Sequence, residues 1–271
     1  MLKKLFVHEW KDSWRLVGIM NLIVIGLTLI GTFFLNNETW NAMDKNEFIA
    51  VTVVVYMMFF IASIAALSMV VTFYFYIRFY RNLYTDQGYL MHTLPVTAHQ
   101  LIWSKTFVAT IWMVISTVVM VGSIFGLVFA AIPGEERGEF WREMSEAFAM
   151  MDFDGRAVVI VVLYILAIIV GQLSNVFMGY ASISIGQMFK KQKVLGAIGV
   201  YIGIYMLIQT VSSYGMMFVT MFIDPYVMET SMEADNFMIV FLLILMLISG
   251  LLTTGFYFIT HYIMKNKLNL E

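Results

Sequence analysis

Few residues of this chain have the types and spacing that catalysis requires. Its four histidines do not form the His-Glu-x-x-His pattern of zinc hydrolases, and it has no cysteine to supply a thiolate. Asp152 and Asp154 form an acid pair, but no serine or histidine nucleophile motif accompanies them. The absence of a Gly-Lys dipeptide argues against a phosphate-binding loop of the Gly-x-x-x-x-Gly-Lys-Ser/Thr kind. We therefore expect that the chain is not an enzyme and that it binds no metal or cofactor itself.

The polar groups inside the apolar parts of the chain are amides and hydroxyls, without Asp, Glu, Lys or Arg. A proton relay or a driving-cation site within a membrane needs such ionisable groups, so we expect no ion-coupled transport. The amides have two interpretations: they line a path for cargo, or they make hydrogen bonds between helices. The candidate path-lining amides are Asn21, Gln172, Asn175 and Gln209.

These amides are positioned by six long apolar runs that contain none of the charged residues. A helix of about 20 apolar residues crosses a bilayer, and a charge at its centre costs about 2.5–3.5 kcal/mol. The composition agrees, because 61% of the residues are apolar and only 13% are charged. We predict an all-α integral membrane protein with a single domain, residues 1–271, and six transmembrane helices. The predicted spans are residues 16–35, 48–77, 106–132, 157–189, 194–222 and 237–260.

The charged residues divide unequally between the two sides of the predicted bundle. The amino terminus, the even-numbered connections and the carboxyl terminus hold twelve basic and four acidic residues, and the opposite side holds four basic and fourteen acidic residues. Basic loops remain in the cytoplasm. We therefore expect a multi-pass protein with both termini cytoplasmic.

Residues 1–15 have the pattern of an interfacial helix. Aromatic residues recur at i, i+4 and i+8, with basic residues on the other side, which suits a helix lying between acyl chains and anionic headgroups. The simpler interpretation is an anchor that orients the first span. The predicted anchor residues are Phe6, Trp10 and Trp14 with Lys4, Lys11 and Arg15.

Residues 135–151, on the opposite side, form a second amphipathic segment and a predicted external helix. Its apolar stripe faces away from a glutamate stripe, and Arg142 is spaced to pair with Glu146. Such a helix is either a lid over the bundle or a receptor for a cationic substrate.

The cytoplasmic connection between the second and third spans carries the most informative local pattern, acid-x-Gly-Tyr-Leu-x-x-Thr-Leu-Pro. A helical wheel over residues 83–95 gathers Leu83, Leu90 and Leu94 on one side, and Pro95 ends the helix because a proline disfavours the α conformation in the preceding residue. A short amphipathic helix between two long spans can move both when force is applied from the cytosol. The predicted coupling residues are Asp86, Gln87, Gly88, Tyr89, Leu90, Met91, His92, Thr93, Leu94 and Pro95.

This pattern, followed by residues 99–105 at the entry to the third span, resembles the coupling-helix region of type-2 permeases of ATP-binding cassette (ABC) exporters. The layout of that family covers essentially the whole chain, with an interfacial helix, six spans and both ends inside. The resemblance implies a bacterial-type cell membrane, a cytosolic ABC ATPase that holds ATP and Mg, and a second permease half, identical or different. Membrane lipid and cargo are the other expected partners, and nucleic acid is not one.

Two glycine patterns permit close approach of helices, either within one subunit or at a seam between two permease halves. They are Gly122-x-x-x-Gly126 and Gly199-x-x-x-Gly203.

The cargo expectation depends on the 23 methionines and 23 phenylalanines, whose side chains adapt to varied apolar shapes. Lipid-facing surfaces also accept both types. The chain looks similar to permeases that export phenol-soluble modulins or antimicrobial peptides, so we expect amphipathic peptide cargo. It departs from many relatives because its segment 223–236, after the fifth span, is short and acidic. Export of lipids or drugs, and a membrane sensor or assembly protein that transports nothing, remain alternatives.

Overall fold

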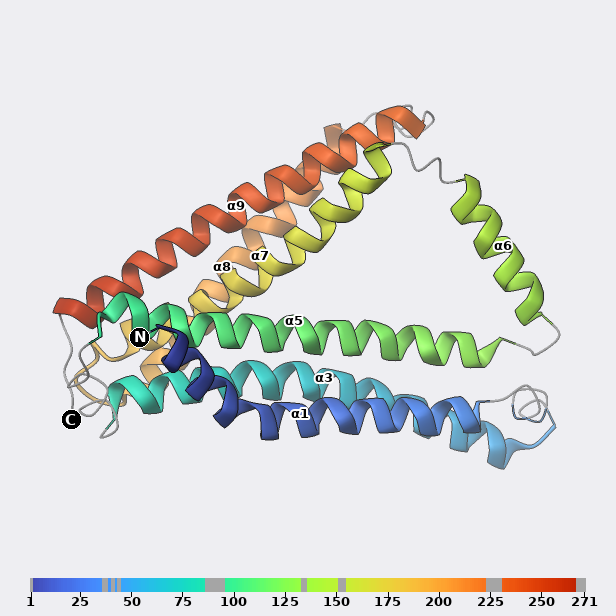
Figure 1. Ribbon diagram of the computed structural model, residues 1–271, viewed down its shortest axis with the longest axis horizontal. Helices are drawn as coiled ribbons and strands as arrows, with labels where there is room; N and C mark the ends of the chain where they lie inside the picture. The colour runs from blue at the N-terminus through green and yellow to red at the C-terminus, as the bar shows by residue number, and fades with distance from the viewer. Residues whose placement is uncertain are drawn as a thin grey trace. The chain divides into compact units, whose positions relative to one another are not determined.

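The computed structural model confirms the predicted fold class. All regular secondary structure in the described residues is α-helical, and six helices are long and apolar enough to cross a membrane. The chain is therefore a multi-pass membrane protein. The structure describes residues 2–35, 39, 42, 45–85, 96–132, 136–150, 155–222 and 231–266. The helices are α1 (Leu2–Phe34), α3 (Glu47–Tyr84), α5 (Ala98–Ala131), α6 (Arg137–Met150), α7 (Gly155–Gly186), α8 (Lys193–Phe222) and α9 (Ser231–Asn266) (Figure 1).

The membrane-length helices extend beyond most of the apolar runs that predict them. The 38 residues of α3 span about 57 Å at about 1.5 Å per residue, which exceeds the roughly 30 Å hydrocarbon core. Polar residues at the helix ends continue the α conformation, and none of these helices contains a proline. Two predicted boundaries consequently differ: residues 2–15 continue into the first span as one helix, and Leu83 and Tyr84 form the last turn of α3. The rest of the predicted coupling helix, 86–95, lies outside the described residues.

The chain divides into two compact units. The first unit contains residues 1–6, 74–110 and 153–271, and the second contains residues 7–73 and 111–152. Helices α7, α8 and α9 belong to the first unit, α6 belongs to the second, and α3 and α5 contribute to both.

In the second unit, α1, α3 and α5 are tied by polar contacts within an apolar core. The Tyr56 hydroxyl of α3 donates to the Leu27 carbonyl of α1 at 2.6 Å. The Asn21 amide of α1 donates to the Ser116 hydroxyl of α5 at 3.0 Å. Leu35, Val53, Phe60 and Leu127 form the buried apolar cluster between these helices.

Helix α6 lies within the predicted external segment 135–151, and its first turn packs on the end of α5. Arg137 donates to the Ile132 carbonyl at 3.1 Å, and its guanidinium lies over the Phe129 ring. The Arg142 guanidinium lies 3.8 Å from the Glu146 carboxylate, the pairing that its spacing indicates, and 3.1 Å from Glu139.

In the first unit, α7 packs against both α8 and α9 (Figure 1). The second half of α7, from Val176 to Ser184, is almost continuously buried. Gly186 at its end lies so close to the backbone of Ala197 in α8 that a Cβ would not fit. The carboxyl half of α7 is therefore the centre of this unit.

Candidate coupling region

The candidate coupling region consists of the two helix ends that flank residues 85–97, namely the last turns of α3 and the first turns of α5. Both helix ends lie in the first unit. The coupling motif itself, Asp86–Pro95, lies outside the described residues. The structure describes the contacts that hold the two helix ends on either side of this motif.

The end of α3 is fixed to α7 by a buried hydrogen bond and a ring stack. The hydroxyls of Tyr84 and Ser184 are 2.7 Å apart, and both residues are buried, with exposed fractions of 4% and 0%. One turn earlier, Phe79 stacks on Tyr180 with ring centroids 3.6 Å apart and planes 8° apart. Leu83 is completely buried as well. These residues hold α3 in place and do not form an exposed docking surface.

A second contact between α3 and α7 lies about two turns before Tyr84 in α3. The Tyr76 hydroxyl is 2.8 Å from the backbone oxygen and 3.0 Å from the side-chain oxygen of Asn175, both of which accept its proton. The Tyr76 ring lies against Gly179, where a Cβ would overlap the ring. The glycine is required here by close approach. Asn175 thus makes a hydrogen bond between helices, which is one of the two roles that the sequence leaves open for it.

The beginning of α5 is fixed to α9 and α7 by aromatic side chains. His99 Nδ1 lies 2.7 Å from the Tyr257 hydroxyl of α9. Trp103 lies between Tyr257 and Phe177, with ring-centroid distances of 5.9 and 5.6 Å. Edge-to-face and tilted rings at such distances attract each other beyond their apolar burial. The residue before the connection 85–97, Tyr84, is therefore held on α7, and the first turn of α5 after it is held on α9 and α7.

The other predicted path-lining amides differ in their surroundings. Asn21 is buried and donates to Ser116, which is an interhelical role like that of Asn175. Gln172 is half-buried, whereas Gln209 is exposed on α8. Of the four predicted path-lining residues, Gln209 is the one that is exposed.

The predicted interfacial segment is partly packed against protein. The Trp10 ring stacks on Trp112 of α5 with centroids 4.8 Å apart, so it does not lie free on the aromatic stripe. Trp14 is 52% exposed and Phe6 is half-buried. Lys4, Lys11 and Arg15 are exposed, as expected for residues that contact headgroups.

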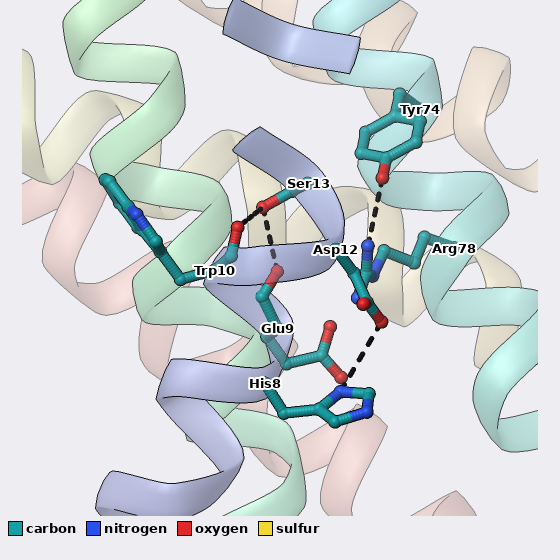
Figure 2. A network of polar contacts seen from close by, with 7 residues as sticks. All are labelled: His8, Glu9, Trp10, Asp12, Ser13, Tyr74 and Arg78. Atoms are coloured by element: carbon teal, nitrogen blue, oxygen red, sulfur yellow. Dashed lines mark hydrogen bonds and ion pairs between the residues drawn. The ribbon is translucent and has the colours of Figure 1, made fainter. Parts of the chain in front are cut away.

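A local polar network supports this part of α1 (Figure 2). The buried Ser13 hydroxyl lies 2.8 Å from the Glu9 carbonyl and 3.2 Å from the Trp10 carbonyl. Such bonding back to the preceding turn often bends a helix. His8 Nδ1 lies 3.4 Å from the Asp12 carboxylate on the exposed side.

In the first unit, Arg78 donates to the Tyr74 hydroxyl at 2.9 Å.

The predicted glycine seams are only partly used within the chain. A Cβ at Gly126 would lie 3.3 Å from Thr28 Cγ2 of α1, so this position packs inside the second unit. Gly122, Gly199 and Gly203 have open space at the Cβ position. Those three remain accessible to a neighbour outside this chain.

Sequence reasoning missed the partners of the helix ends, Tyr180, Ser184, Phe177 and Tyr257. Their types are ordinary for a membrane helix, so no signal in the chain singles them out. Among the described residues, no group of three or more His, Cys, Asp or Glu is placed to hold a metal ion. Comparison with protein-family models, with curated proteins and with solved structures finds no match to this chain.

Proposed function

We infer that this chain is the permease subunit of an ATP-driven exporter similar to the type-2 ABC permeases. The observation that carries this proposal is the anchoring of residues 85–97 at both ends, Tyr84 on α7 and His99 on α9. A force on this connection reaches α7 through the buried contact of Tyr84 with Ser184, because close-packed buried contacts transmit strain. It reaches α9 through the exposed pair of His99 and Tyr257 and the Trp103 ring beside them. Such an arrangement suits a segment that a partner protein pushes.

The energy source in this proposal is a separate cytosolic ATPase, which holds ATP and Mg. It docks on Asp86–Pro95, and both termini lie on its side of a bacterial-type cell membrane. The apolar runs contain no Asp, Glu, Lys or Arg that could couple transport to an ion gradient. The excess of basic residues on the connections of that side supports the orientation.

The cargo in this proposal is an amphipathic or hydrophobic peptide, carried between two permease halves. Helix α8 supports a second half, because every side chain from Gln209 to Met217 is exposed and Gly199 and Gly203 have open space. A protein neighbour would satisfy the Gln209 amide, which lipid cannot do. Export of lipids or drugs by the same architecture is the second candidate.

Co-purification tests the docking proposal. The tagged full-length chain is extracted in mild detergent from its own cells, and bound proteins are identified by mass spectrometry and assayed for ATP hydrolysis. We expect an ABC ATPase with the unaltered chain and its loss with Leu90→Asp or Gly88→Trp. Ser145→Asp on α6 is the matched control, because it adds a charge at an exposed position in the other unit.

Retention of the ATPase by both coupling variants would reject docking at this segment. If the unaltered chain binds no ATPase, the exporter proposal itself fails and the sensor or assembly function becomes the better one. Cargo is tested separately in vesicles that contain both proteins. ATP-dependent accumulation of an amphipathic peptide supports peptide export, and stimulation by lipid alone reverses that ranking.

A further inference from the structure

A groove of about 650 Å³ lies beside the last turns of α9, at the end of the first unit where α7 also ends. Phe258, Tyr262 and Lys265 follow one another at i, i+4 and i+7, so they form one wall along the helix. Met188, in the turn after α7, contributes the other side. The groove is thus apolar along the helix and basic at its end.

The apolar wall of this groove is left exposed by the residues that the structure describes. Phe258 is 62% exposed and Tyr262 is 57% exposed, whereas Ile263 beneath them is buried. Aromatic side chains at the end of a membrane-spanning helix lie at the level where acyl chains meet headgroups. At this level of the membrane, the apolar group available to contact the two rings is a lipid acyl chain.

The basic end of the groove carries several positive charges, and the described acids of the first unit lie far from it. Lys265 lines the groove itself, and the exposed Lys190 and Lys191 follow Met188 by two and three residues. Among the described residues of the first unit, the acids are Glu233 and Asp235, near the start of α9. About 30 residues of helix, or roughly 45 Å, separate that start from Lys265. This end therefore attracts an anion.

We propose that the groove binds an anionic phospholipid. The acyl chain lies against Phe258 and Tyr262, and the phosphate is held by Lys265 with Lys190 and Lys191. Basic pockets between membrane helices bind anionic headgroups in this way. None of the residues that line the groove belongs to the predicted anchor or to the predicted coupling residues, and the proposal does not depend on the exporter proposal.

Native mass spectrometry of the full-length chain from mixed nanodiscs tests the site. The nanodiscs contain phosphatidylglycerol and phosphatidylcholine with identical acyl chains, and the retained lipids are counted. We expect a preference for phosphatidylglycerol that falls about fivefold for each lysine neutralised, and about 100-fold in the triple variant Lys190→Gln, Lys191→Gln, Lys265→Gln. The matched control, Lys45→Gln, Arg81→Gln, Arg142→Gln, removes the same charge at exposed basic positions outside both the groove and the predicted anchor, and it should keep the preference.

A steric variant tests the groove without changing charge. Ile259 lines it, so Ile259→Trp should fill the acyl position and abolish retention of phosphatidylglycerol. Added inorganic phosphate should not displace the lipid, because it has no acyl chain. Displacement by phosphate would mean that an ion site, and not a lipid site, is present.

Three further outcomes overturn the proposal. Equal retention of the two lipids by the unaltered chain means that the site has no anionic preference. Equal loss in the two triple variants means that the attraction is general. A photo-crosslinking amino acid in place of Tyr262, activated in native membranes, should capture lipid. Capture of a polypeptide would show that a protein covers the groove.

Discussion

The hydrogen bond between Tyr84 and Ser184 predicts an unequal pair of single substitutions. The Ser184 hydroxyl donates to the Tyr180 carbonyl at 2.8 Å, so the tyrosine must be the donor in the 2.7 Å bond to Ser184. Tyr84→Phe removes the donor and leaves Ser184 bonded to the backbone, which costs about 1 kcal/mol. Ser184→Ala removes the acceptor and leaves a buried phenol hydroxyl without one, which costs about 1–3 kcal/mol.

The double variant distinguishes this account from two independent contacts. Once Tyr84 is phenylalanine, Ser184→Ala removes only a local bond, so the double variant should lose about as much stability as Tyr84→Phe alone. The free energy of unfolding is measured by reversible titration of the purified chain with a denaturing detergent, and the four values form a double-mutant cycle. Ser182→Ala is the matched control, because this buried hydroxyl of α7 donates to the Met178 carbonyl at 2.7 Å.

Two results would refute this reasoning. Equal single losses that add in the double variant mean that the two hydroxyls do not interact. A loss in Ser182→Ala as large as that in Ser184→Ala means that the cost comes from removing any buried hydroxyl of α7. In either case the anchoring of α3 on α7 could not depend on this bond.

Two further substitutions test the packing of each unit by the same unfolding titration. Gly179→Ala should lower the free energy of unfolding by about 1–3 kcal/mol, because the new Cβ would overlap the Tyr76 ring. Gly171→Ala on the same helix has open space and should be neutral or stabilising. Equal effects of the two substitutions would contradict the close approach at Gly179. Trp10→Ala should lower stability by about 1–3 kcal/mol, because Trp10 is half-buried and its stack on Trp112 is lost. An unchanged stability would mean that the ring lies in lipid.

The amides illustrate what a sequence leaves open. A polar side chain in an apolar run predicts either a lumen or a hydrogen bond between helices, and the run itself contains nothing that selects one. Asn21 and Asn175 make interhelical contacts, because Ser116 and Tyr76 lie opposite them on neighbouring helices. Gln209 has an exposed amide instead. The choice depends on how each helix is rotated toward its neighbours.

The amino-terminal segment illustrates a similar limit. Its aromatic and basic spacing predicts an amphipathic helix, and residues 2–15 are helical. The pattern cannot tell whether lipid or protein covers the aromatic stripe, because both environments favour an apolar ring. Trp10 lies on Trp112, whereas Trp14 is exposed.

The sequence by itself determined the class and the spans of this protein. In lipid, backbone amides must be satisfied within the segment, so a charge-free run of about 20 apolar residues is a membrane helix. Only the tertiary structure decided how the ends of the connection 85–97, the predicted coupling segment, are held. Tyr84 meets Ser184 across 100 residues of sequence, and His99 meets Tyr257 across 158. Such pairings depend on how two packed helices are rotated and shifted relative to each other. The sequence of either helix alone does not determine that rotation or shift.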